Sequence, residues 1–96
     1  MIPTRDVQDY VPLFKPVPQY PRSALASSQE GSVVVEFSVD EAGFVQNPKV
    51  VDRIGSKVFD KPSLEVAKRF RYAPAFVDGK PVRTDGVQNR IVYEIN

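Results

Sequence analysis

The chain has 96 residues, 42% of them hydrophobic, which suits one domain with a single thin core. Thirteen basic and twelve acidic residues give a net charge of +1, which removes the long-range electrostatic case for nucleic acid or an anionic membrane as the main partner. The absence of cysteine and histidine excludes thiol nucleophiles, disulfides, zinc-type ligand sets and imidazole bases.

The first 21 residues hold five of the nine prolines, which excludes a helix or a central strand in this segment. We interpret residues 1–15 as the extended end of a proline-containing linker and residues 16–96 as the folded domain. The run from Val11 to Val17 is too apolar for a free linker. Part of it is therefore expected to lie against the domain.

A short helix is predicted from Arg22 to Gln29, because Pro21 suits the first turn of a helix. Ala24 and Leu25 offer only a small apolar contact. Gly31 is expected to close this helix in a left-handed conformation.

A β-hairpin follows. From Gly31 to Val39, apolar and polar residues alternate with the period of a strand that buries one face. Val34 alone breaks the alternation, so the outer face is not expected to be fully solvated. Asp40–Gly43 has turn chemistry, and a return strand runs from Phe44 to Val51. Pro48 predicts an edge or a bulge on the return strand, because proline has no amide proton.

The main helix is predicted from Lys61 to about Arg71, after a loop over Arg53–Lys57. Asp60 is its predicted N-cap and Pro62 lies in its first turn. The helix is expected to end at Tyr72-Ala73-Pro74, since a residue before proline disfavours helical geometry. The apolar residues that share its inner face are Val66, Ala67 and Phe70.

Residues Ala75–Gly86 are predicted to form a long loop that carries a small ribbon, with Asp78-Gly79 as its turn. The last strand, Val87–Ile95, alternates cleanly. The predicted fold is α+β: a small antiparallel three-stranded sheet packed against one main helix, with a second short N-terminal helix, in the order αββαβ. In this arrangement the last strand lies beside the first, at the edge of the sheet.

No catalytic or metal-binding set is visible, and no cofactor is expected. Asp40, Asp78 and Asp85 belong to turns, which is the ordinary role of aspartate there. The basic cluster Lys68–Arg71 could be read as a nucleic-acid patch, but a solvated helix face is the favoured reading. The exposed edge of the last strand has two readings, a site for an added peptide strand or a protected edge, and the periodicity leaves both open.

Several stretches, in order, resemble the C-terminal domain of the TonB energy-transducer family. Together they cover about residues 16–95, and the ordered set is far more specific than any one piece. These stretches are Pro18–Pro21 before a short helix, Gly31–Asp40 with Gly43 closing the turn, Phe59-Asp60, Arg69–Pro74 and Ile91–Ile95.

The resemblance implies a non-enzymatic protein, anchored in the bacterial inner membrane by one N-terminal helix and complexed there with ExbB and ExbD. A proline-rich linker would carry the domain through the periplasm to TonB-dependent outer-membrane receptors, whose TonB-box peptide it grips to drive uptake of siderophores, haem or cobalamin. Peptidoglycan is a further candidate partner. No apolar run here is long enough for a membrane span, so the anchor is expected in a preceding part of a longer protein.

In the family, the box peptide pairs with the last strand as an extra strand. The implied partner-binding residues are Val87, Gln88, Asn89, Arg90, Ile91, Val92 and Tyr93, with Gln19, Tyr20 and Pro21 adjacent.

Two departures from the family pattern matter: Phe70 stands where many relatives carry tryptophan, and the chain stops at Asn96 without the further strand that some members have. The second departure bears on the oligomeric state. The alternative function is a TolA-like or cell-wall-binding structural periplasmic domain with a different partner. Binding to a TonB-box peptide would discriminate the two functions.

Overall fold

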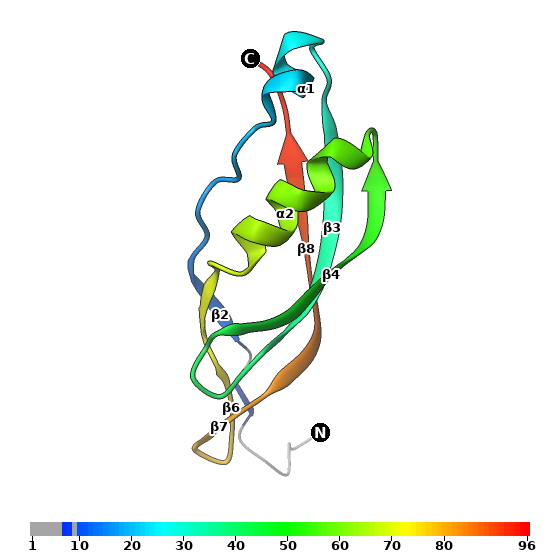
Figure 1. Cartoon of the computed structure of the whole chain (residues 1–96). Coiled ribbons are helices and arrows are strands. Elements are labelled where there is room, and N and C mark those ends of the chain that lie inside the picture. The colour runs from blue at the N-terminus through cyan, green and yellow to red at the C-terminus, as the bar shows by residue number, and fades with distance from the viewer. Residues whose placement is uncertain (1–6, 9) are drawn as a thin grey trace, which may run out of the picture.

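A computed structural model describes residues 7–8 and 10–96 of the chain. The three longest strands, β3 (Gly31–Val39), β4 (Val45–Ile54) and β8 (Thr84–Tyr93), form one antiparallel sheet in the order β4–β3–β8 (Figure 1). The last strand therefore pairs with the first strand of the hairpin, and β8 lies at an edge of this main sheet.

Two helices complete the main body. The longer helix, α2 (Asp60–Ala67), follows a single 3-10 turn, η1 (Lys57–Phe59), and lies across one face of the sheet (Figure 1). The short helix, α1 (Arg22–Ala26), lies at the end of the molecule where the chain finishes. No helix within the described residues is long and apolar enough to cross a membrane. The α+β class, with antiparallel strands and two helices, is confirmed.

The core forms between β3 and α2. The alternating side chains of Val33, Val35, Phe37 and Val39 are each at most 2% exposed, and they join the inner face of α2 in one apolar cluster. Val34 points to the other face of the sheet but is only 8% exposed. The outer face is thus partly covered, as the broken alternation predicts.

The hairpin turn is held by the carboxylate of Asp40. One oxygen accepts hydrogen bonds from the amides of Ala42 (3.0 Å) and Phe44 (2.8 Å), and these bonds, with that of Phe44 first, lower the pKa of Asp40. Gly43 has φ +88° and lies so close to the Tyr72 carbonyl that a Cβ would collide with its oxygen. The predicted turn is confirmed.

The return strand β4 is both an edge strand and bulged, as Pro48 predicts. Its register against β3 shifts between Glu36 and Ser38, where Asn47 takes φ +53°. The strand also continues past Val51 to Ile54, so the loop predicted from Arg53 begins only at Gly55.

The cap of α1 differs from the prediction. Gly31 does not close the helix, because it is the first residue of β3. Ser28 takes the left-handed conformation instead, with φ +55°. Its amide bonds the carbonyl of Leu25 at 3.1 Å, and the amide of Gln29 bonds that of Ala24 at 2.8 Å, which is the hydrogen-bond pattern of a Schellman cap.

The prediction that Asp60 caps α2 is also wrong. Asp60 is the first residue of the helix, and its carboxylate accepts hydrogen bonds from Arg53 Nε (2.8 Å) and Nη2 (2.6 Å). This bidentate ion pair lowers the pKa of Asp60 and links the start of α2 to β4. The hydroxyl of Ser56 caps the preceding turn η1 instead, by accepting from the amide of Val58 at 3.1 Å.

The helix α2 ends at Ala67, a full turn before the predicted end near Arg71. The amides of Arg69 and Phe70 turn back to the carbonyls of Val66 and Ala67, and the chain then enters the strand β5 (Arg71–Ala73).

The predicted order αββαβ is incomplete, because the structure has five further short strands. The strand β2 (Val11–Phe14) pairs with β5, and β1 (Val7–Gln8), β6 (Ala75–Val77) and β7 (Lys80–Val82) form a small sheet in the order β1–β6–β7. The predicted ribbon in the loop is confirmed: Asp78 and Gly79 turn between β6 and β7 with φ +52° and +79°.

Candidate binding edge on strand β8

The backbone of β8 is paired on one side only. From Gly31↔Tyr93 to Phe37↔Val87 it pairs with β3, and no other described strand lies against its second side. An edge of this kind offers a row of amides and carbonyls to an added strand.

The predicted site residues on β8 divide by the face on which their side chains lie. The side chains of Val87, Ile91 and Tyr93 are 3%, 5% and 2% exposed and belong to the core. The Tyr93 hydroxyl lies 2.8 Å from that of Ser63, which donates to the Phe59 carbonyl at 2.7 Å. These side chains are not available to a partner, so only their backbone groups can serve the site.

The outer side chains of β8 are tied to β3. Gln88 donates to a carboxylate oxygen of Glu36 at 3.0 Å, and Arg90 donates to the hydroxyl of Ser32 at 2.9 Å. The bond from Gln88, followed by the charge of Lys49, lowers the pKa of Glu36. These pairs hold the register of β8 and leave Val92, which is half exposed, as the free apolar side chain of the strand.

Residues 15–21 connect β2 to α1, and we call this segment the strap. Its first residue, Lys15, donates from Nζ to the side-chain oxygen of Asn89 at 2.7 Å, and its ammonium lies 5.7 Å from the centre of the Phe70 ring. The strap is therefore tied to the middle of β8 by a contact that no sequence pattern predicts.

Tyr20 anchors the other end of the strap. Its ring packs edge-on against Phe59 and Tyr93 at 5.7 and 5.5 Å, and its hydroxyl donates to the Gln29 carbonyl. Burial, and then the charge of Glu30, raise the pKa of Tyr20. The predicted neighbour of the peptide edge is thus a structural residue that touches the C-terminal end of β8 through Tyr93.

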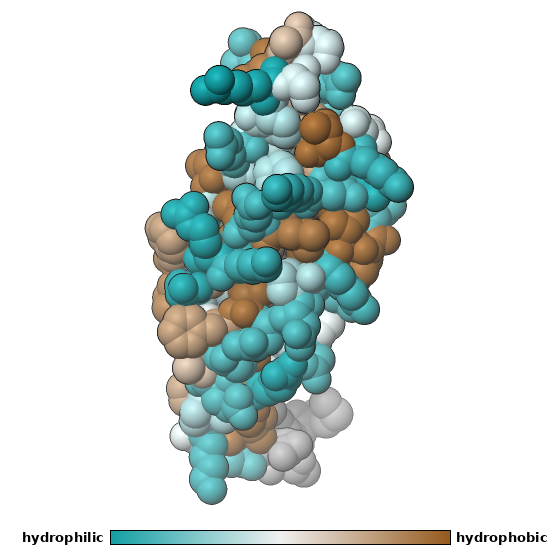
Figure 2. Space-filling view, viewed as in Figure 1, coloured by the Kyte–Doolittle hydropathy of each residue, from teal (hydrophilic) through white to brown (hydrophobic). Residues whose placement is uncertain are grey.

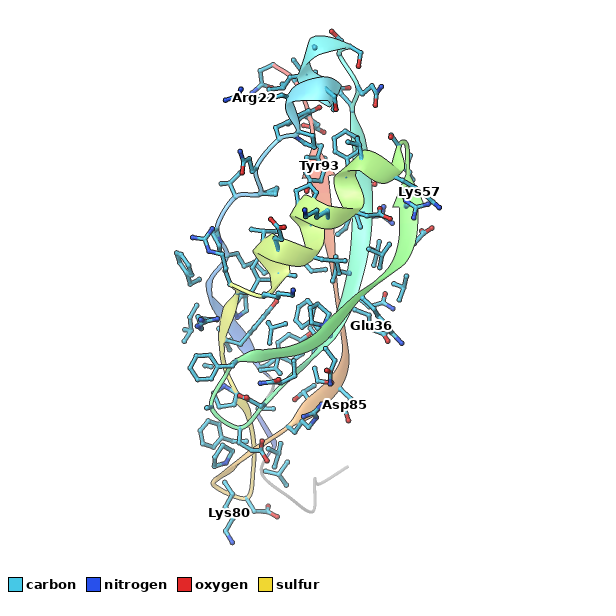
Figure 3. All side chains as sticks on the ribbon, in the orientation of Figure 1. Arg22, Glu36, Lys57, Lys80, Asp85 and Tyr93 are labelled. Atoms are coloured by element: carbon cyan, nitrogen blue, oxygen red, sulfur yellow. The ribbon has the colours of Figure 1, made fainter. Side chains whose placement is uncertain are left out.

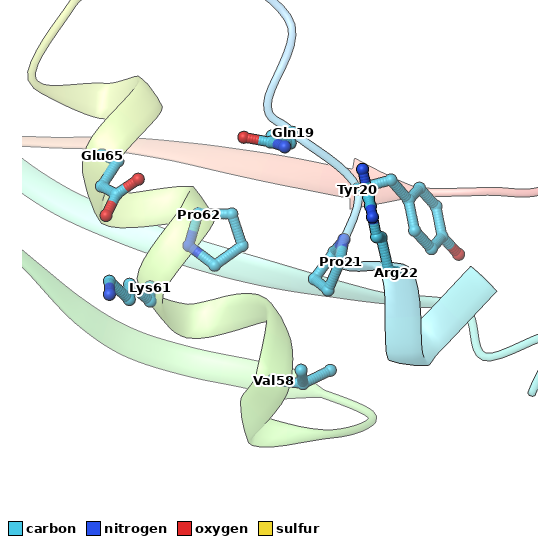
Figure 4. A pocket seen from close by; sticks show the side chains of 8 residues that line it. All are labelled: Gln19, Tyr20, Pro21, Arg22, Val58, Lys61, Pro62 and Glu65. Atoms are coloured by element: carbon cyan, nitrogen blue, oxygen red, sulfur yellow. The ribbon is translucent and has the colours of Figure 1, made fainter. Parts of the chain in front are cut away.

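Gln19 and Pro21, the other two predicted neighbours, lie in the strap on either side of Tyr20. Together with Pro62 and Glu65 of α2 they line a cavity of about 370 Å³ between the strap and that helix (Figure 4). Tyr20 lines this cavity as well and also contacts β8 through Tyr93.

The described residues contain no group of three or more acidic residues, histidines or cysteines that could hold a metal ion. The carboxylate of Asp85, which was predicted to be a turn residue, accepts hydrogen bonds from the Ser38 hydroxyl (2.6 Å) and from Arg83 Nε (2.9 Å). These bonds lower the pKa of Asp85. Asp85 therefore serves to link β8 to β3.

The comparisons with known proteins match the fold and the motifs. The family described as "Gram-negative bacterial TonB protein C-terminal" matches residues 16–95. Protein TonB of Escherichia coli K12 is 34% identical over 82% of this chain and 30% of its own length, and Protein TonB of Vibrio cholerae is 32% identical over 68% and 27%. This chain therefore spans less than a third of either relative.

Two solved structures are similar over most of their length. The solution NMR structure of the Pseudomonas aeruginosa TonB C-terminal domain has a TM-score of 0.76 at 28% identity, and covers 92% of this chain and 88% of its own. The TonB2 protein of Vibrio anguillarum has a TM-score of 0.67 at 30% identity, with 93% and 84% covered.

Proposed function

Because the chain belongs to the family of Gram-negative bacterial TonB protein C-terminal domains, we propose that it binds the TonB-box peptide of an outer-membrane receptor by strand addition along β8. The peptide pairs with the backbone of Val87–Tyr93. In the full-length protein the domain passes energy from the proton gradient, tapped by ExbB and ExbD, to receptors that import iron-siderophores, haem or cobalamin. The domain works on the periplasmic side of the inner membrane, to which a single helix anchors the protein.

One observation supports this grip more than any other: β8 is a ten-residue strand with one partner and an unpaired second side in the described structure. Its inward side chains are committed to the core and its outer polar side chains to β3. What remains for a ligand is the main chain, which suits the capture of an extended peptide of variable sequence.

The strap fits the same function, because it cannot close the edge itself. Pro16 and Pro18 have no amide protons, so this segment is unable to pair with β8 as a regular strand. Its contact through Lys15 is a single side-chain bond. We expect an incoming strand to displace this bond when it pairs beside Asn89.

The affinity is expected to be weak to moderate. A single added strand buries well below the standard interface of roughly 1,600 Å², and Val92 is the only large apolar side chain that β8 exposes. Isothermal calorimetry with the N-terminal peptide of a receptor measures this binding.

A proline scan through Gln88, Asn89, Arg90 and Ile91 tests the grip. Amides alternate in direction along a strand, so Gln88 and Arg90 share one direction and Asn89 and Ile91 the other. Proline deletes the amide proton and fixes φ. Where that amide pairs with β3, the variant should unfold; where it faces the open edge, the variant should fold but no longer bind the TonB-box peptide.

Alanine at the same positions is the matched control for this scan. Gln88→Ala and Arg90→Ala remove side chains but keep the amides, so both should still bind the peptide. Ile91→Pro also removes a buried side chain, which makes Asn89→Pro the cleaner variant of its pair. If every folded proline variant binds as the wild type does, the peptide docks elsewhere and the strand-addition proposal fails.

A further inference from the structure

We propose that Arg90 and Val92, on the outer face of β8, select the peptide that adds to this strand and fix its register. The peptide they select carries an acidic side chain beside Arg90 and an apolar side chain beside Val92. This inference rests on the proposed strand addition and deepens it, because it assigns side-chain selectivity to an edge whose main chain supplies the pairing.

The outer face of β8 is open to the side chains of a partner. The helix α2 lies across the other face of the main sheet, where Figure 2 shows hydrophilic side chains with apolar ones between them. On the outer face Gln88, Arg90 and Val92 are all exposed, Val92 to 52%. Opposing residues of neighbouring strands have their side chains on the same face, about 5 Å apart. Alternate residues of an added strand therefore lie directly beside these three side chains.

Arg90 is a cation without a carboxylate partner. It makes no salt bridge to any residue in the described part of the chain. The acidic residue in its own row of the sheet is Asp52, which lies two strands away on β4, beyond Val34. The carboxylate of Asp52 accepts a hydrogen bond from the amide of Arg53 at 2.9 Å. An added strand on the open side of β8 is thus placed to bring Arg90 its first anionic neighbour.

The present contact of Arg90 does not prevent this pairing. Arg90 donates from one terminal nitrogen to the hydroxyl of Ser32 at 2.9 Å, which leaves the other N–H groups of the guanidinium for a ligand. The Ser32 hydroxyl is a neutral acceptor, and a carboxylate is the stronger one. A glutamate beside Arg90 therefore gains an ion pair and displaces at most one neutral hydrogen bond.

The neighbouring outer positions do not favour an acidic side chain. Gln88 donates to Glu36, which is already paired with Lys49 at 3.5 Å, so an acid beside Gln88 meets a second carboxylate. Glu94 is exposed and directly follows β8, and by alternation its side chain belongs to the outer face. Along this edge of the sheet, the position beside Arg90 is therefore the favourable one for an acidic residue.

Val92 completes the pattern, because it follows Arg90 at the next position on the same face. An apolar side chain of the added strand beside Val92 would cover its exposed methyl groups. A slip of one residue moves both ligand side chains to the other face, and a slip of two takes the acidic side chain away from Arg90. Only one register satisfies both contacts.

Calorimetry with short synthetic strands tests the selection by Arg90. The host peptide is rich in threonine and carries glutamate and valine on the same face at neighbouring positions; in the matched peptide glutamine replaces the glutamate. The glutamate peptide should bind the wild type about two- to fivefold more tightly at low salt. This difference should disappear in Arg90→Gln, and Arg90→Glu should prefer a peptide with lysine instead. Equal binding of the two peptides to the wild type would overturn the selection.

Lys80→Gln is the charge-matched control. It removes one positive charge at the opposite end of the molecule from Tyr93, the last residue of β8 (Figure 3). The preference for the glutamate peptide should be unchanged in this variant. An equal loss of preference in Lys80→Gln and Arg90→Gln would mean that net charge alone attracts the peptide, and Arg90 would be excluded.

The register is tested by NMR, through cross-peaks between the methyl groups of Val92 and those of the peptide valine. When the glutamate and valine are moved together by two residues along the host, the cross-peak should follow them. A reversed peptide, with the valine before the glutamate, should bind with a different affinity, because parallel and antiparallel strands require opposite orders. A cross-peak that stays at one peptide position, or equal affinity of the two orders, would overturn the contact with Val92.

The same titrations separate this inference from strand addition itself. If glutamate and glutamine peptides shift the β8 amides equally, strand addition stands and the selection by Arg90 fails. If neither they nor a TonB-box peptide shift these amides, strand addition fails and the selection falls with it.

Discussion

At the scale of single residues, several residues of β8 contribute their side chains to the core and their backbone groups to the candidate site. Tyr93 is buried, stacks on Phe59 at 4.4 Å between ring centres and bonds Ser63, yet its amide and carbonyl belong to the proposed edge. Ile91 likewise has a core side chain and a backbone that belongs to the proposed edge. Side-chain substitution at these positions therefore reports on folding, and only changes to the backbone, such as proline, report on peptide pairing.

Phe37 is the clearest test of the strand register. Its ring is 2% exposed and lies against Phe70 at 6.2 Å and Tyr72 at 5.9 Å between ring centres. Phe37→Ala should destabilise the fold by about 3–5 kcal/mol, which can abolish folding of a domain this small. Thermal unfolding by circular dichroism measures the loss. Val92→Ala, at a half-exposed position, is the control; a melting temperature unchanged in Phe37→Ala would contradict the burial of this face.

At the scale of elements, the parts that could be predicted are those fixed by local patterns. The period of two in β3 and β8, the Asp40–Gly43 turn and the break at Pro48 each predict their own structure, because burial, turn geometry and the missing amide act locally. On β8 the same alternation separates core side chains from outer ones.

The ends of the elements could not be predicted, because distant partners decide them. Arg71 would continue α2 by local spacing, but β5 pairs with β2, more than fifty residues earlier in the chain. Asp60 has the chemistry of an N-cap, but its carboxylate accepts two hydrogen bonds from Arg53 on β4 instead. Likewise, nothing in the sequence near Lys15 indicates its bond to Asn89, which depends on how the strap crosses to β8.

The ion pair between Arg53 and Asp60 gives a prediction with a defined pH range. Hydrogen bonds from Arg53, and then its charge, hold the pKa of Asp60 below its usual range. A carboxyl group with a lowered pKa in the folded state stabilises the protein above its unfolded pKa of about 4, and this contribution is lost as the pH falls through the folded value.

Asp60→Asn should therefore melt a few degrees below the wild type at neutral pH, and the gap should close as the pH falls from about 4 through the lowered pKa of Asp60. Thermal melts across this pH range measure the difference. Glu94→Gln removes one negative charge from an exposed position that has no salt bridge among the described residues, and it serves as the control. A gap between wild type and Asp60→Asn that stays constant with pH would show that the ion pair does not set the stability of this link.

At the scale of the whole molecule, the domain is elongated, with extents of 54 × 27 × 23 Å. The main sheet runs along most of its length, with α1 at one end and the small strands β6 and β7 at the other (Figure 1). Residues 1–15 contact this structure through two short strands, β2 on β5 and β1 on β6, and the four side chains of β2 are exposed. The family match begins after β2, at residue 16. We therefore propose a boundary between a linker end, residues 1–15, and the domain, residues 16–96.

Deletion of residues 1–15 tests this boundary. The core cluster draws on β3, α2 and β8, so the shortened chain should still fold, with the amide spectrum of the main sheet preserved. Stability should fall by on the order of 2 kcal/mol, because β5 and β6 each lose a partner strand and Tyr72 loses the edge-on ring of Tyr10 at 5.5 Å. Tyr10→Ala in the whole chain separates the ring contact from the strand pairing.

Binding of a TonB-box peptide should persist in the deletion, since the backbone edge of β8 is intact and the bond from Lys15 is gone. A deletion that melts without cooperativity, while Tyr10→Ala melts as the wild type does, would place β2 inside the folding unit and move the boundary toward the N-terminus.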